Sequence, residues 1–188
     1  PLLMLPVMMT PVVAALGWRL LWDSQYGAVN HFLAFILRRD VDIVWLTNRW
    51  TALFAILITD VWQWTPFMFL ILLAGLASLN PEHYEAAALD GAGPWQQFWA
   101  ITLPGLAPVI AVAVIFRTMD AFKIFDQIFM LTQGQPGTST ETISWYIYQV
   151  GYKFFNMGYA SAVSYLLLIF LSIIGTIYVS RFLREEHL

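Results

Sequence analysis

The charged residues that could do chemistry gather in one short stretch of an otherwise apolar chain. Arg117, Asp120, Lys123 and Asp126 alternate in sign at steps of three residues. Residues three apart on a helix are neighbours and can pair, while an isolated charge at mid-bilayer costs at least about 3 kcal/mol. These four charges therefore require pairing, water or a partner subunit. On one helix they would fan over half of its circumference, because each step turns by about −60°.

Two interpretations of this charged stretch remain open. In the first, some of the charges line a path through the membrane, together with Thr118 and Phe122. In the second, they form a self-neutralising ladder at an interface between helices or subunits, because perturbed charge networks are often structural.

A second polar pair, Asp60 and Gln63, lies three residues apart and therefore on one helical face. We expect that face to point into protein or a wet cavity rather than into lipid. Sugar sites combine aromatic faces with hydrogen-bonding side chains, and further candidates of that kind are Trp62, Asn156, Tyr159, Ser161 and Ser164. The predicted substrate path comprises Trp62, Gln63, Arg117, Thr118, Asp120, Phe122, Lys123, Tyr159 and Ser161.

Signatures of enzymes and of cofactor sites are absent from the sequence. There is no G-x-x-x-x-G-K-[ST] phosphate loop, no G-x-S-x-G and no H-E-x-x-H. The chain has no cysteine, and its three histidines are scattered without metal-ligand spacing. We therefore expect a chain that is not itself an enzyme and that binds no metal and no cofactor.

Composition places the chain among membrane proteins. Of its 188 residues, 60% are hydrophobic and only 11% are charged, against about 25% charged in a soluble domain. The net charge of −3 gives no case for binding nucleic acid.

The apolar pattern predicts an all-α protein with about four spans. Each apolar run approaches the roughly 20 residues that cross a bilayer. A short helix is expected around 28–38 and a loop over 132–142. Aromatic residues over 143–155 favour the membrane interface. No linker divides the chain, so we expect one domain over 1–188. Its start without Met inside an apolar run suggests that N-terminal spans are missing. The spans are expected over 1–22, 51–77, 103–127 and 158–179.

The residue pattern of the stretch 80–104 is typical of a capped helix and a turn between two spans. Asn80 is a favoured N-cap and Pro81 a favoured first helical residue. Gly91 is a candidate C-terminal stop, so a helix is expected over 81–90. A second short helix begins at Pro94, and Pro104 is expected to interrupt it. On this residue pattern alone, the stretch could equally be a plain interhelical turn.

The residues of this stretch resemble a known signature. Glu85-Ala86-Ala87, Gly91, Ile101 and Leu103-Pro104, with nine residues between Gly91 and Ile101, match the EAA signature of binding-protein-dependent ABC importer permeases. The flanks resemble the carbohydrate branch, the relatives of the maltose transporter's membrane subunits. Those flanking pieces are Leu89-Asp90-Gly91-Ala92, Trp95, Phe98, Phe125-Asp126, Leu131-Thr132-x-Gly134 and Tyr146-Ile147-Tyr148. Gln135 departs from the family, which usually has a second glycine before Pro136.

This resemblance implies a type I ABC importer transmembrane domain in a prokaryotic plasma membrane, with residues 80–104 as a cytoplasmic coupling loop. It implies a second permease, an ABC ATPase dimer that uses ATP and Mg, an external solute-binding protein and a substrate that is a sugar, a polyol or a sugar-phosphate. The expected ATPase-coupling residues are Glu85, Ala86, Ala87, Asp90, Gly91, Ile101, Leu103 and Pro104. Counting Lys and Arg alone would instead favour an external 78–103.

Two other functions stay possible on the residues alone. An ion-coupled secondary transporter could use the charges from Arg117 to Asp126 as a relay, with 80–104 as a mere turn. A structural membrane subunit would have no path at all.

Overall fold

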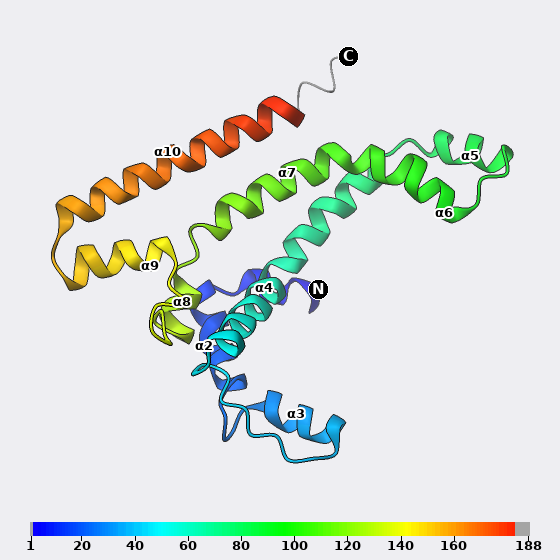
Figure 1. Cartoon of the computed structure of the whole chain (residues 1–188). Helices are drawn as coiled ribbons and strands as arrows, with labels where there is room; N and C mark the ends of the chain where they lie inside the picture. Colours follow the sequence, from blue (N-terminus) through cyan, green and yellow to red (C-terminus); the bar gives the residue numbers. More distant parts are fainter. Residues whose placement is uncertain (1, 183–188) are drawn as a thin grey trace. The chain divides into compact units, whose positions relative to one another are not determined.

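The computed structural model describes residues 2–182, and every regular element in that range is helical (Figure 1). The prediction of an all-α fold is therefore confirmed. The N-terminal part holds η1 (Leu2–Met4), α1 (Leu5–Met8), α2 (Pro11–Leu21), α3 (Ala28–Leu37), α4 (Arg49–Ala77) and α5 (Pro81–Leu89). The rest holds α6 (Pro94–Gln97), η2 (Phe98–Thr102), α7 (Leu103–Ala121), α8 (Asp126–Leu131), α9 (Ile143–Tyr148), η3 (Gln149–Lys153) and α10 (Met157–Phe182).

Among residues 2–182, three helical runs are long and apolar enough to cross a membrane, where about four were expected. They are Arg49–Ala77, Pro94–Ala121 and Met157–Ser180, of 29, 28 and 24 residues. The apolar run at 1–22 does not form a single helix. Thr10 is extended, with ψ 145, because Pro11 disfavours a helical residue before it. The 11 residues of α2 then rise only about 17 Å, less than the roughly 30 Å of the hydrocarbon core.

The predicted C-terminal boundary of the third span was wrong. The helix was expected to run to about Gln127, but α7 ends at Ala121 and α8 begins at Asp126. Ile124 and Phe125, which lie between them, pack against the hydrophobic core instead of continuing the helix. The four alternating charges therefore do not share one helix.

Pro104 was expected to interrupt the helix that Pro94 begins, but the helix continues through it. The π turn η2 comes directly before α7, and the amide of Leu103 donates to Phe98 O, five residues back. A π turn widens the backbone locally. Pro104, which has no N–H and would crowd the carbonyl four residues before it, is accommodated next to this widened turn.

The helices divide into two compact units, which are described separately. The first comprises the residues up to Pro66 together with Asp120–Leu168, and the second comprises Phe67–Met119 together with the residues from Ile169 onward. In the first unit α2 packs against α8. Its buried core contains Ala15, Trp22, Trp45, Ala55, Ile56, Ile128, Leu131 and Trp145.

Polar side chains tie the first unit together at long sequence range. The indole of Trp22 donates to the hydroxyl of Thr59 at 3.3 Å, and Arg19 donates to the carbonyl of Met130 at 3.0 Å. Thr142 donates to the carbonyl of Ile124 at 2.7 Å. The first two bonds fix α4 and α8 against the C-terminal part of α2, and thereby help to position Asp60 and Gln63 in the middle of α4.

In the second unit two glycines mark close approaches between helices. A Cβ on Gly75 would lie 2.9 Å from the side chain of Val109, and one on Gly175 would collide with the methyl group of Met119. Small residues let membrane helices approach closely in this way. The rings of Phe67 and Phe116 lie 5.2 Å apart, so α4 and α7 also meet there.

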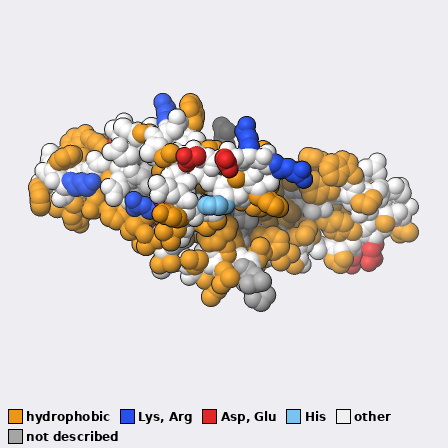
Figure 2. Space-filling model, turned by 90° about the horizontal axis from the view of Figure 1, so that it is seen from below, with side chains coloured by type: hydrophobic (Ala, Val, Ile, Leu, Met, Phe, Trp, Pro, Cys, Tyr) orange, Lys and Arg blue, Asp and Glu red, His pale blue; other side chains and the backbone are white. Residues whose placement is uncertain are grey.

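Large apolar side chains remain exposed along the three long helices. On α10 they include Tyr165, Leu166, Leu168, Ile169, Phe170, Ile173, Ile177 and Val179. Hydrophobic side chains cover much of the face drawn in Figure 2, and the charged ones on it are few. Exposed apolar surface of this extent is what a bilayer or other membrane subunits cover.

Candidate functional site

A buried polar cluster sits on the inner face of α4 in the first unit. Asp60 and Gln63 are 7% and 2% exposed, and Gln127 at the start of α8 is 3% exposed. Nε2 of Gln127 donates to Asp60 Oδ1 at 3.4 Å and to Gln63 Oε1 at 3.2 Å, and Gln63 donates to the carbonyl of Met9 at 3.4 Å. The expectation that Asp60 and Gln63 share a face turned into protein is confirmed.

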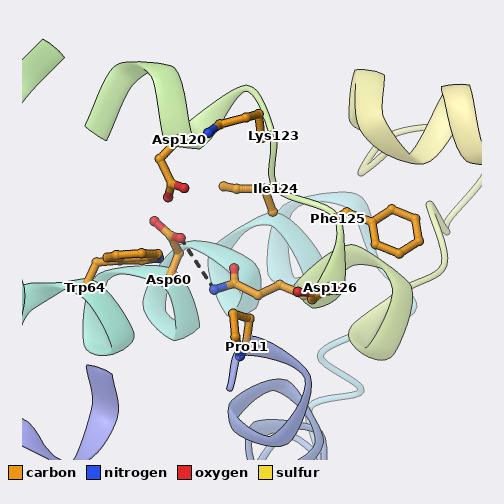
Figure 3. Close-up of a pocket in the computed structure, with 9 residues that line it drawn as sticks. Pro11, Asp60, Trp64, Asp120, Lys123, Ile124, Phe125 and Asp126 are labelled. Carbon is orange, nitrogen blue, oxygen red and sulfur yellow. Dashed lines mark hydrogen bonds between the residues drawn. The ribbon is translucent and has the colours of Figure 1, made fainter. Parts of the chain in front are cut away.

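A pocket of about 90 Å³ opens over this cluster. Figure 3 shows the carboxyl groups of Asp60 and Asp120 turned toward each other, with the Trp64 ring beside Asp60 and the Lys123 side chain extending toward Asp120. The pocket combines an aromatic face, carboxylates and amides, which is the mixture that polar organic ligands require. Its lining is Pro11, Asp60, Trp64, Asp120, Lys123, Ile124, Phe125, Asp126 and Gln127.

One buried polar atom of the cluster lacks a protein partner among the described residues. Oε1 of Gln127 is buried and accepts no hydrogen bond from the described residues. A buried acceptor without a partner costs about 1–3 kcal/mol. A water or a ligand hydroxyl that donates to this oxygen would remove that cost.

The structure brings only part of the predicted path together. Asp120 and Lys123 line the pocket, and Gln63 is connected to it by the hydrogen bond that it accepts from the lining residue Gln127. Arg117 and Thr118 belong to the second unit, where the hydroxyl of Thr118 donates to the carbonyl of Val114 at 2.7 Å.

The remaining path candidates do not line this pocket. Trp62 meets Trp18 edge to face at 5.5 Å, and Phe122 is partly exposed. Tyr159 hydrogen-bonds Tyr146, which raises the pKa of Tyr146. Ser161 lines another cavity, of about 340 Å³, together with Gly151, Tyr152 and Tyr165.

Sequence reasoning missed Trp64 and Gln127 as pocket residues. Trp64 could have been found, because it follows Asp60 by four residues and therefore shares its helical face. Gln127 carried no such signal, because its position depends on the turn that separates α7 from α8. No group of three or more His, Cys, Asp or Glu suited to a metal ion occurs in the part of the chain that the structure describes.

The second candidate site is the segment from Pro81 to Pro104 in the second unit, which Figure 1 shows as two short helices joined by a turn. The side chain of Asn80 caps α5 by accepting from the amide of Glu82 at 3.0 Å. The amide of Gly91 donates to Ala88 O at 3.1 Å, and the amide of Ala92 donates to Ala87 O at 2.9 Å. This pair of bonds is a Schellman motif, and Gly91 adopts the positive φ of 80° that it requires. The predicted N-cap at Asn80 and the predicted C-terminal stop at Gly91 are confirmed.

Side chains hold the turn in one shape. The hydroxyls of Tyr84 and Thr102 lie 2.9 Å apart and join α5 to η2. Gln97 donates to the carbonyl of Ala92 at 3.1 Å, and the amide of Gly93 donates to Gln96 Oε1 at 3.0 Å. The segment is therefore a small rigid body attached to the start of α7.

The predicted coupling residues occupy two parts of this body. Glu85 and Ala86 are exposed on α5 and Ala87 is half-buried, while Asp90 and Gly91 are exposed at the turn. Ile101 lies in η2, and Leu103 and Pro104 form the first turn of α7. No residue of α5 is fully buried.

Exposed apolar side chains flank the turn. Leu89, at the end of α5, is 90% exposed. The rings of Trp95, Phe98 and Trp99 contact one another with centroids 5.4–5.9 Å apart, and all three are exposed.

Comparison with known proteins identifies the family. Residues 2–185 match the family described as "Binding-protein-dependent transport system inner membrane component". The chain belongs to this family. With three span-length helices in the part that the structure describes, it is a multi-pass inner membrane protein.

Individual relatives are similar over nearly the whole chain. The "Trehalose/maltose transport system permease protein MalF" of Thermococcus litoralis is 39% identical over 98% of this chain and 62% of its own length. The crystal structure of a bacterial ABC transporter involved in the import of the acidic polysaccharide alginate matches 97% of this chain and 63% of that chain, with TM-score 0.85 and 28% identity.

A second structure, of the bacterial alginate ABC transporter in complex with an alginate pentasaccharide-bound periplasmic protein, matches 96% of this chain and 61% of that chain, with TM-score 0.75 and 28% identity. This inner membrane component therefore spans about three fifths of the length of the proteins it matches. The prediction of an ABC importer transmembrane domain is confirmed at the level of the fold and the family.

Proposed function

We propose that this chain is a permease subunit of an ATP-driven importer of a sugar or polyol. Two features support this function beyond family membership. One is a short, capped and exposed helix rigidly attached to a span, and the other is a polar pocket with an aromatic wall at the buried face of another span.

In the proposed mechanism α5 docks on an ATPase subunit. Ala86 and Ala87 leave the helix slim, so another surface can approach its backbone closely, and Glu85 supplies a polar contact. Gly91 turns the chain back toward the membrane. Ile101, Leu103 and Pro104 then connect the docked helix to α7, with Asp90 at the turn between them.

The Tyr84–Thr102 bond makes this connection stiff. Movement of α5 is therefore passed to the start of α7 instead of being absorbed by the turn. ATP and Mg act on the partner ATPase dimer, and its closure needs to bias α5 by only a few kcal/mol between two states, because a ligand shifts an equilibrium only by its differential affinity.

The pocket beside Asp60 is the proposed substrate contact within this chain. Trp64 offers a flat apolar face, and Asp60, Asp120 and Gln127 offer hydrogen-bond acceptors. A second permease subunit would complete the path, and an external solute-binding protein would deliver the sugar. The other predicted path residues do not line this pocket and are weaker candidates for contact with the substrate. They are Trp62, Arg117, Thr118, Phe122, Tyr159 and Ser161.

Reconstitution tests the proposed function. The full-length chain, assembled with its partner permease, ATPase and binding protein in liposomes, is expected to accumulate at least one sugar or polyol from a panel only when ATP is inside. Uptake that follows an ion gradient in the absence of ATP would instead support the secondary-transporter alternative built on Arg117–Asp126.

A further inference from the structure

We propose that α3 lies at the boundary between the headgroups and the acyl chains of the bilayer, with its outer face against phospholipid. The outer face consists of Phe32, Phe35 and Ile36, which are 64%, 82% and 57% exposed. This inference goes beyond the proposed function, because it concerns where the chain meets the membrane and holds whatever the transporter carries.

The composition of α3 is apolar on its outer face as well as on its inner face. Its ten residues, AVNHFLAFIL, include only two polar side chains and no Asp, Glu, Lys or Arg. Asn30 is 3% exposed on the inner face, and Nδ1 of His31 lies 3.0 Å from the carbonyl oxygen of Gly27 in the turn before it. A helix on a water-exposed protein surface normally carries charged and polar residues on its outer face. An exposed apolar face instead marks contact with a membrane or with another protein.

The inner face of α3 is attached to the first unit and fixes the direction of the outer face. Asn30 donates to the carbonyl of Ile43 at 3.0 Å and accepts from the indole of Trp45 at 2.8 Å. Val29 and Leu33 pack against the hydrophobic core of the unit. The helix therefore cannot roll inward to bury its outer face without breaking these contacts.

The same contacts set the depth of α3 in the membrane. Thr51, in the first turn of α4, donates to the carbonyl of Trp45, so α3 is joined through Trp45 to the point where α4 begins. Figure 1 shows α3 at this end of the unit, where α2 ends and α4 begins.

The first turn of α4 lies near the surface of the hydrocarbon core. The 29 residues of α4 rise about 44 Å, more than the roughly 30 Å of that core. Arg49 and Trp50 are exposed at its beginning, and the guanidinium of Arg49 lies 5.3 Å from the centre of the Trp50 ring. Both residue types are typical anchors at the membrane interface. Since α3 is joined to this turn, its apolar outer face lies at the same interface.

The length of α3 and the residues after it suit this position. Its ten residues rise about 15 Å, too little to cross the bilayer, and apolar segments this short are often interfacial. An interfacial helix buries its apolar face by about 5–10 Å at the boundary of headgroups and acyl chains. Arg38 and Arg39 follow the helix directly and are exposed, as residues in the headgroup layer are. Asp40 and Asp42 balance their charge, so we expect the contact with zwitterionic as well as anionic phospholipids.

Photocrosslinking identifies what covers the outer face. The photoreactive residue p-benzoylphenylalanine replaces Phe35 in one variant and Phe32 in a second, which serves if the first fails to assemble. A third variant carries it in place of Asp42, which is exposed in the loop after α3. The full-length chain, assembled with its partner permease and ATPase in phosphatidylcholine liposomes, is illuminated with and without the solute-binding protein. Mass spectrometry then identifies what is attached to this chain.

The expected result at positions 35 and 32 is a mass increase of one phosphatidylcholine molecule, with a several-fold lower yield of this adduct at position 42. A crosslink from positions 35 and 32 to the partner permease or to the solute-binding protein overturns the inference, because a protein would then cover this face. A lipid yield at positions 35 and 32 no higher than at position 42 also overturns it, because the face would then lie in water.

Discussion

The hydroxyl groups of Tyr84 and Thr102 lie 2.9 Å apart and join α5 to the π turn that opens α7. The bond spans 18 residues of sequence and closes the segment from Pro81 to Pro104 on itself. Through this bond an exposed helix acquires a second attachment to a membrane span, besides the chain that connects them.

Removing this attachment should weaken coupling without abolishing it. A neutral hydrogen bond contributes about 0.5–1.5 kcal/mol, so Tyr84→Phe is expected to lower ATP-driven uptake by about two- to ten-fold in the reconstituted complex. Tyr26→Phe, at an exposed tyrosine, is the matched control. Uptake at the wild-type rate in Tyr84→Phe would show that the turn is stiff without the bond.

The backbone conformation at Gly91, and not the space around it, should decide which substitutions this position tolerates. Its φ is 80°, and a Cβ there would meet nothing within 4 Å. A non-glycine residue in this region costs about 1–2 kcal/mol, and Asn less. Gly91→Val should therefore weaken binding to the ATPase partner more than Gly91→Asn does.

The control for Gly91 is Gly93, where a Cβ also meets open space but φ is −71°. Gly93→Val should bind the ATPase partner nearly as the wild type does. Equal losses in Gly91→Val and Gly93→Val would argue that side-chain bulk, and not backbone conformation, decides docking.

The buried amide cluster should contribute measurably to stability. Gln127→Leu removes the donors to Asp60 Oδ1 and Gln63 Oε1, which costs about 1–3 kcal/mol for buried groups. Such a loss lowers Tm by roughly 2–4 °C per kcal/mol in a chain of this size. Thermal unfolding in detergent measures it, with Gln25→Leu at an exposed site as the control. A change no larger than that of the control would mean that the cluster adds nothing to the fold.

Asp23 makes the turn between α2 and α3 sensitive to acid. Its carboxylate accepts from the amides of Tyr26 and Gln25, each at 2.9 Å, and these bonds lower its pKa from 3.8. A lowered folded pKa stabilises the turn above the unfolded pKa of about 3.9, and this contribution is lost as pH falls through the folded value. The protection factor of the Tyr26 amide, its exchange rate relative to an unstructured peptide at the same pH, should fall as pH drops from about 5 to about 2, and Asp23→Asn should remove this fall. An identical pH profile in both proteins would contradict it.

The elements governed by local signals could be predicted from the sequence. Asn80, Pro81 and Gly91 act through the first and last turns of one helix, and the observed cap and Schellman motif follow from them. The apolar runs at 51–77 and 158–179 likewise became α4 and α10 within two residues at their N-terminal ends.

The elements that depend on tertiary packing could not be predicted from the sequence. Ile124 and Phe125 carry no helix-breaking signal, yet their packing against the core ends α7 and separates Asp120 from Asp126. The prediction that the four charges share one helix was therefore wrong, and the pocket lined by Asp120 and Asp126 depends on that turn. The expected span over 1–22 did not form, because Pro11 disfavours a helical conformation at Thr10 and so ends the preceding helical turn.

Uncoupling at Glu85 is the most direct test of the proposal that α5 receives the energy of ATP hydrolysis. Sugar uptake and ATP hydrolysis are measured together in proteoliposomes that contain the full complex. Glu85→Lys should still insert and fold, but ATPase association should weaken and uptake should fall at least ten-fold, equivalent to about 1.4 kcal/mol. Glu141→Lys, in the loop before α9, should leave both activities intact. Wild-type uptake and wild-type ATPase association in Glu85→Lys would contradict the coupling role of this helix.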